Sequence, residues 1–101
     1  MPDYVLSNKA ESDLTEIYVY SFRAFGEAKD DSYFLGLRDF LQELADNPHL
    51  GRSAAYLRTG LFCPRYARHI VFYMAEAAGI FVVRILHDAM DIQRNLSSDS
   101  P

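Results

Sequence analysis

The sequence predicts an α+β domain in which an antiparallel α-hairpin packs on a small antiparallel β-sheet. Two observations support this prediction. Apolar residues recur at helical spacing through two long segments of the first half, about residues 8–25 and 27–45. Runs rich in Ile, Val, Phe and Tyr then fill the second half, at 61–67, 69–75 and 79–87. With a short opening strand at 3–6, the predicted element order is β-α-α-β-β-β.

The two helices have start and stop signals in the sequence. Asn8 can accept hydrogen bonds from the free N–H groups of the first turn, and Glu11 three residues later can complete a capping box. Gly26 tolerates the left-handed conformation in which many helices end. The second helix starts directly after it, and Asp-Asn-Pro at 46–48 ends it. One glycine-centred turn between two helices predicts an antiparallel hairpin.

The last two predicted strands are joined by Glu-Ala-Ala-Gly at 76–79, a turn short enough for an antiparallel β-hairpin. The segment 90–96 is too short for an independent helix, and we expect it to dock as a short C-terminal helical turn. The polar residues 97–101 predict a disordered tail. A chain of 101 residues has room for one core, so residues 1–96 are predicted to form a single domain.

The composition excludes several functional classes. The sequence has no apolar run long enough to cross a membrane and no secretion signal, so we expect a cytoplasmic location. Cys63 is the single cysteine and the three histidines are scattered, so no metal site and no cofactor is predicted. The first fifty residues carry four basic and ten acidic side chains, and the rest carry six arginines against four acids. This asymmetry predicts two faces with different partners, with ordinary solvation as the alternative.

The first helix carries more apolar surface than packing on one sheet requires. Val19, Tyr20 and Phe22 lie beside its core stripe, on faces that should point outward. A neighbouring set of exposed apolar side chains indicates a contact surface for another protein. The residues predicted to bind a partner are Tyr18, Val19, Tyr20, Phe22 and Phe25. The alternative is a wide core stripe on a helix that is rotated slightly from its expected position.

Several segments, read together in this order, resemble a known family. They are NKAESDLTEIYVY, FGEAKDDSYFLGL, LADNPHLGR, RHIVFYM and VVRILHDAMDIQRNL. The most specific parts are NPHLGR after the second helix, the RHIVFY strand and RILHDAMDIQRNL at the end. The resemblance spans about residues 4–96, and it is to the ParE toxins of the RelE/ParE superfamily, from type II toxin–antitoxin systems.

The resemblance implies a cytoplasmic toxin that inhibits DNA gyrase and is held inactive by a ParD-type antitoxin encoded beside it. Such antitoxins are typically ribbon-helix-helix DNA-binding proteins whose C-terminal segment folds along the toxin. This gives the outward apolar set of the first helix a partner. The resemblance further implies a hetero-oligomer with the antitoxin, and neither membrane association nor direct nucleic-acid binding by this chain.

The nuclease branch of the superfamily cleaves mRNA on the ribosome, so a RelE-like mRNA endonuclease is the alternative function. Phosphodiester cleavage needs a proton acceptor, a proton donor and cations around the phosphate. However, Ile70 stands roughly where those nucleases carry a catalytic Arg, and neither Tyr nor Lys follows in DAMDIQRNL. No catalytic residue is therefore predicted. Four basic residues are candidates for contact with the target, with solvated strand ends as the alternative: Arg65, Arg68, His69 and His87.

Arg84 interrupts an apolar strand, and a buried guanidinium is costly unless a carboxylate receives it. By simple alternation it shares a face with Ile80, Val82 and Leu86. We predict a structural ion pair between Arg84 and Asp91, which a turn after the strand can return to the sheet, with Asp88 as the second candidate.

Overall fold

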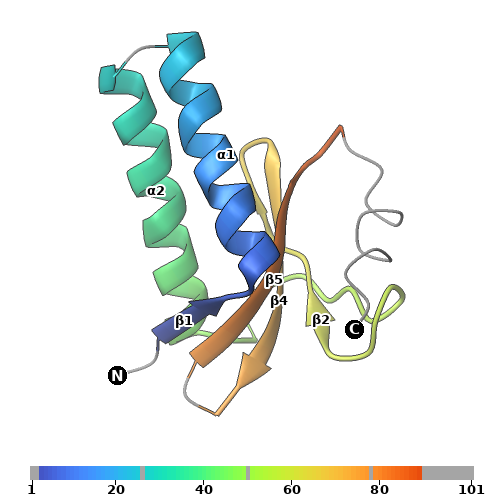
Figure 1. Cartoon of the computed structure of the whole chain (residues 1–101). Coiled ribbons are helices and arrows are strands. Elements are labelled where there is room, and N and C mark those ends of the chain that lie inside the picture. Colours follow the sequence, from blue (N-terminus) through green and yellow to red (C-terminus); the bar gives the residue numbers. More distant parts are fainter. Residues whose placement is uncertain (1–2, 26, 50, 78, 90–101) are drawn as a thin grey trace.

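A computed structural model of the chain describes residues 3–25, 27–49, 51–77 and 79–89, and it describes their side chains outside 20–32. The helices are α1 (Asn8–Phe25) and α2 (Glu27–Asp46). The strands are β1 (Asp3–Leu6), β2 (Leu61–Phe62), β3 (Arg65–Tyr66), β4 (His69–Glu76) and β5 (Gly79–His87). Both helices lie on the same side of the sheet (Figure 1). The α+β class is confirmed, and the element order is confirmed except that four strands follow the helices instead of three. The predicted C-terminal turn and tail lie outside the described residues.

The sheet has the strand order β1-β5-β4-β2, and β3 also pairs with β4. The predicted hairpin of β4 and β5 is present, with His69 opposite His87 at one end. β1 runs parallel to β5, from Asp3 opposite Gly79 to Leu6 opposite Val82. The sheet is therefore mixed and not fully antiparallel as predicted, because its N-terminal strand joins the antiparallel strands in parallel orientation.

The predicted strand 61–67 consists of two short strands, β2 and β3, separated by Pro64. Proline has no N–H group and cannot donate to a sheet ladder, so it interrupts the strand. Its carbonyl still accepts a hydrogen bond from the Val71 N–H at 2.9 Å. β3 then returns to β4 through a tight turn in which Ala67 has a φ of 51°. This turn brings Arg65 and Arg68 next to the start of β4.

The N-cap of α1 is Ser7 rather than Asn8. The Ser7 hydroxyl accepts a hydrogen bond from the Ala10 N–H at 3.0 Å, and the Ser7 carbonyl accepts one from the Glu11 N–H at 2.9 Å. The hydroxyl also donates to the Val83 carbonyl at 2.7 Å, which ties the start of the helix to the sheet. The predicted capping box is wrong because Asn8 is already the first helical residue, one position after the cap.

The core has two layers, one on each face of the sheet. The cluster between the helices and the sheet contains Ala10, Ile17, Leu37, Leu41, Leu44, Ala45, Val71, Tyr73, Ile80, Val82 and Ile85. The cluster on the opposite face contains Ala54, Leu61, Phe72, Val83 and Leu86, with partly buried residues such as Leu57 and Met74 packed against it. The segment 51–60 contributes to this second cluster and covers the face of the sheet opposite the helices (Figure 1).

The register of β4 and β5 shifts after Phe72, which pairs with Arg84, while the next residue of β4 pairs with Val82. Val83 is therefore an extra residue on β5, a β-bulge. Ile80 and Val82 pack in the helix-side cluster, whereas Phe72 packs in the other cluster. The predicted shared face of Ile80, Val82 and Leu86 is wrong, because Leu86 packs in the cluster on the opposite face and simple alternation does not continue through a bulge.

Candidate functional site

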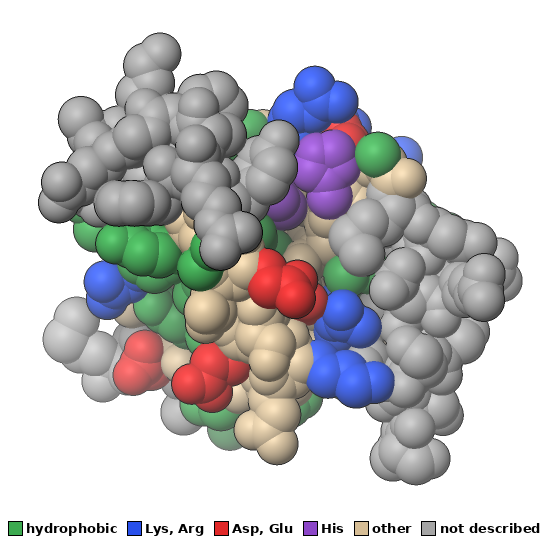
Figure 2. All heavy atoms as spheres, turned by 45° about the horizontal axis from the view of Figure 1, so that its top comes forward, with side chains coloured by type: hydrophobic (Ala, Val, Ile, Leu, Met, Phe, Trp, Pro, Cys, Tyr) green, Lys and Arg blue, Asp and Glu red, His purple; other side chains and the backbone are tan. Residues whose placement is uncertain are grey.

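The basic residues predicted to contact the target gather at one end of β4 and β5. His69 begins β4 and His87 ends β5 directly opposite, with ring centroids 5.3 Å apart. Arg65 and Arg68 border the tight turn before β4, and their side chains are 59% and 72% exposed. We call Arg65, Arg68, His69 and His87 the basic cluster. Figure 2 shows histidine side chains beside basic and acidic ones on the surface.

Asp88 is the carboxylate that lies beside three members of the basic cluster. It forms an ion pair with Arg65, and its Oδ1 lies 3.9 Å from Nη2 of Arg68 and 3.3 Å from Nδ1 of His87. Its N–H also donates to the Arg68 carbonyl at 2.9 Å. Ion pairs of exposed arginines contribute little stability. They place two exposed guanidinium groups beside one carboxylate at the end of the sheet.

His69 is anchored to α2 through Tyr33. The Tyr33 hydroxyl oxygen and the His69 Nδ1 are 2.7 Å apart, and the two rings meet edge to face with centroids 5.7 Å apart. Burial, and then the neighbouring His87, lower the pKa of His69 below its usual 6.5. Burial also raises the pKa of Tyr33. Both rings are therefore neutral at physiological pH, so His69 adds no positive charge to the basic cluster.

In the described structure the carboxylate that receives Arg84 is Asp13 on α1. The Arg84 Nε donates to Oδ2 at 2.7 Å and the Nη2 to Oδ1 at 3.0 Å, a bidentate pair. The Ile85 N–H also donates to Oδ2 at 3.1 Å. The side chains of Arg84 and Asp13 are each 11% exposed. The pairing of β1 with β5 ends at Val82. Beyond that point the Asp13 carboxylate accepts the Ile85 N–H, as a carbonyl of a neighbouring strand would do.

This partner of Arg84 differs from the two aspartates considered from the sequence. Asp88 contacts the basic cluster instead. Asp91 lies outside the described residues, so its pairing with Arg84 stays a prediction. A signal for Asp13 was present, because it follows Ala10 by three residues and therefore falls on the core-facing stripe of α1. A carboxylate on a buried stripe needs a donor, and Arg84 is the buried cation of the described residues.

The predicted partner surface on α1 is described in part. Tyr18 is 37% exposed and Val19 is 40% exposed. The Tyr18 ring also meets the ring of Phe34 on α2 edge to face, with centroids 5.1 Å apart, so it contributes to helix packing as well. The side chains of three further predicted residues are outside the described ones: Tyr20, Phe22 and Phe25.

Comparison with known proteins identifies the family. Residues 4–92 match the family described as ParE toxin of type II toxin-antitoxin system, parDE. This chain belongs to the ParE toxins of type II toxin–antitoxin systems. It is 34% identical over 94 residues to Toxin ParE1 of Mycobacterium tuberculosis (strain CDC 1551 / Oshkosh), covering 92% of this chain and 96% of that protein.

Other relatives of this ParE toxin agree with the assignment. Toxin ParE of Escherichia coli is 32% identical over 98 residues, which cover 96% of this chain and 95% of that protein. A solved structure titled "Chromosomal ParDE TA system from P. aeruginosa" has the same fold, with a TM-score of 0.68 at 20% identity. The match covers 86% of this chain and 96% of that chain.

The chemistry of this ParE toxin follows from the same geometry. The described residues contain no group of three or more His, Cys, Asp or Glu side chains suited to a metal ion. Burial raises the pKa of Cys63, which keeps its thiol protonated and a weak nucleophile. In the basic cluster, the two arginines that would hold a phosphate already lie beside the Asp88 carboxylate. In the described part of the chain, neither helix is long and apolar enough to span a membrane.

Proposed function

We propose that this ParE toxin acts in the cytoplasm by inhibiting DNA gyrase, and that a ParD-type antitoxin neutralises it by forming a hetero-oligomer with it. Membership of the ParE toxins across residues 4–92 is the observation that carries the proposal. The toxin acts by binding, with no catalytic residue, no cofactor and no direct contact to nucleic acid. Two separate surfaces fit the two partners.

The α-hairpin is the proposed antitoxin surface. Tyr18 and Val19 are more than a third exposed although both are large apolar side chains. Burying a side chain of this size stabilises a complex by about 1.5–3 kcal/mol. Tyr20, Phe22 and Phe25 extend the same proposed surface toward the C-terminal end of α1.

The basic cluster is the proposed contact surface for gyrase. Its two arginines are exposed beside Asp88, so a partner can contact both guanidinium groups. Arginine is also enriched among residues that dominate protein interfaces. His69 and His87 complete the surface on the adjoining strand ends.

The first experiment is expression of the chain with and without the antitoxin gene that we expect beside it. Expression alone should arrest growth and block chromosome replication, seen by microscopy, and co-expression should restore growth. Val19→Asp should weaken the purified complex while leaving the toxin folded. Thr59→Asp, an equal charge change at an exposed site on the other side of the sheet, is the matched control. Normal growth without antitoxin would refute toxicity, and an unchanged affinity of Val19→Asp would place the antitoxin surface elsewhere.

One observation favours the mRNA endonuclease as a second candidate. His69 and His87 lie close enough to serve as a proton acceptor and donor, and two arginines adjoin them. The contacts of Asp88 oppose this function, since a carboxylate repels the phosphate that the arginines would have to hold. We expect the purified toxin to leave ribosome-bound mRNA intact. Cleavage that disappears in His87→Ala would establish the nuclease instead.

A further inference from the structure

His87 ends β5 with two contacts that its ring cannot make in a single protonation state. The Ala89 N–H donates to the His87 Nδ1 at 3.0 Å, and this hydrogen bond needs an Nδ1 without a proton. The same nitrogen lies 3.3 Å from Oδ1 of Asp88, and a hydrogen bond to that carboxylate needs a proton on Nδ1. The neutral ring therefore binds Ala89, whereas the charged ring binds Asp88.

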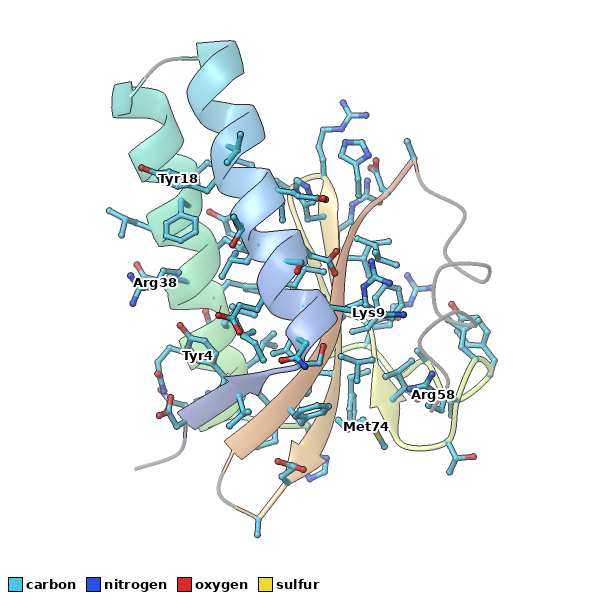
Figure 3. All side chains as sticks on the ribbon, in the orientation of Figure 1. Tyr4, Lys9, Tyr18, Arg38, Arg58 and Met74 are labelled. Atoms are coloured by element: carbon cyan, nitrogen blue, oxygen red, sulfur yellow. The ribbon has the colours of Figure 1, made fainter. Side chains whose placement is uncertain are left out.

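Other charged and titratable side chains surround His87 at this end of the sheet. In Figure 3, side chains with nitrogen and oxygen atoms gather where β5 ends, at the end of the β4–β5 hairpin away from Met74. Among the described residues these groups are Tyr33 on α2, Arg65 on β3, Arg68 in the turn before β4, His69 on β4 and Asp88 after β5.

The two facing histidines take up one proton before they take up two. Their ring centroids are 5.3 Å apart, so a charge on one ring disfavours a charge on the other. Burial and the neighbouring His87 lower the pKa of His69 and outweigh the opposite effect of Asp88. The His87 side chain is 39% exposed, and its Nδ1 faces the Asp88 carboxylate. The first proton therefore binds to His87.

This proton changes which groups contact the Asp88 carboxylate. Arg65 contacts Oδ2, whereas the Nη2 of Arg68 lies 3.9 Å from Oδ1, the oxygen that the charged His87 ring binds. A short hydrogen bond from a charged ring competes with this long contact of Arg68, whose side chain is 72% exposed. The Ala89 N–H loses its acceptor in the same step. The surface thus gains a positive charge, and the Arg68 guanidinium becomes available to a partner.

We propose that proton uptake by His87 switches the end of the hairpin between these two contact patterns, and that the switch strengthens binding of the basic cluster to its target as the pH falls. Histidine side chains change charge between about pH 5 and pH 8, the range in which the switch operates. The proposal rests on the proposed contact of the basic cluster with gyrase and adds the regulation of that contact. Exposed arginines complement an acidic partner surface, so a further positive charge beside them increases the attraction.

The first test follows the toxin without gyrase. NMR of isotope-labelled toxin across this pH range records the ring nitrogens of His87 and the hydrogen exchange of the Ala89 amide, corrected for the intrinsic effect of pH. The protection of this amide should fall by about fivefold as Nδ1 gains its proton, the change expected for one hydrogen bond. In His87→Asn, which takes up no proton in this range, the protection should stay constant. Constant protection in the parent while His87 titrates would overturn the proposal, as would an Nδ1 that stays unprotonated down to about pH 5.

The second test compares the toxin concentrations that halve gyrase supercoiling at about pH 7.5 and about pH 6. The parent should need about fivefold less toxin at the lower pH, the effect of one added charge at an exposed ion pair. Gyrase itself responds to pH, so the ratio of the two concentrations is compared between variants. His87→Asn should bring this ratio below about twofold. His49→Gln, at an exposed histidine after α2, is the matched control and should keep the parent ratio.

Equal ratios for the parent and His87→Asn would overturn the proposal, and so would stronger inhibition by the parent at the higher pH. If His87→Asn does not fold, Asp88→Asn replaces it, because it removes the carboxylate that the charged ring binds. A parent toxin that inhibits gyrase at neither pH would instead refute the proposed target. The Ala89 measurement would then still decide whether the switch exists.

Discussion

Replacing Asp13 with alanine tests what holds α1 to the sheet. The carboxylate accepts two hydrogen bonds from Arg84 and one from the Ile85 N–H, and all three groups are buried. Alanine removes the negative charge from beside a nearly buried guanidinium and leaves that N–H without its acceptor. Breaking a buried ion pair by removing one partner costs about 3–5 kcal/mol. A domain of this size has a free energy of unfolding of about 5–15 kcal/mol, so the variant should fold but with little margin.

Urea unfolding followed by circular dichroism and tyrosine fluorescence measures this loss. The midpoint should fall while the slope m stays constant, which indicates a change of stability rather than of compactness. Glu16→Ala, which removes an exposed acid from the same helix, is the control and should change the free energy by at most about 0.5 kcal/mol. Arg84→Met should cost less than Asp13→Ala, because it removes the charge but keeps an apolar stem. A loss below about 1 kcal/mol for Asp13→Ala would refute the reasoning.

Two further predictions concern α2 and the strand ends that it contacts. The folded pKa of His69 lies below 6.5, so the unfolded chain takes up this proton first as the pH falls, and stability decreases through the window below pH 6.5. His69→Asn should flatten this part of the profile of stability against pH. Tyr33→Phe should keep most of the pH dependence, because burial is the main cause of the lowered His69 pKa. Coincident profiles for the parent and His69→Asn would contradict this prediction. Gly36→Ala should destabilise the fold although alanine favours helices, because the new Cβ would lie 2.1 Å from the Tyr66 hydroxyl oxygen. Thermal unfolding should show a smaller loss in a Tyr66→Phe background, and an equal loss would show that this contact is not the cause.

The fold was largely predictable because local patterns agree with the tertiary packing. The predicted strand at 3–6 and the helix starting at residue 8 match β1 and α1, and the β-hairpin lies where its apolar runs predict it. The departures have local physical causes. Pro64 divides one predicted strand, and the bulge at Val83 interrupts the side-chain alternation that placed Leu86 on the same face as Ile80 and Val82.

The sequence predicted which residues belong to the candidate site, but it did not predict the contacts between them. The sequence placed these basic residues near strand ends, and the register of β4 with β3 and β5 brings together Arg65, Arg68, His69 and His87. It did not indicate that Asp88 contacts Arg65 and Arg68, because these contacts depend on the tight turn between β3 and β4. The contact of Tyr33 with His69 spans 36 residues of sequence, so it required the packing of α2 on the sheet.

The measurement that most directly tests gyrase inhibition is a supercoiling and DNA-cleavage assay with purified gyrase and this ParE toxin. We expect the toxin to inhibit supercoiling and accumulate cleaved DNA in a dose-dependent manner, and we expect prior addition of the antitoxin to prevent both effects. Arg68→Glu, at the most exposed arginine of the basic cluster, should weaken the inhibition without changing antitoxin affinity. Full gyrase activity at every concentration of a toxin that still binds its antitoxin would contradict gyrase as the target.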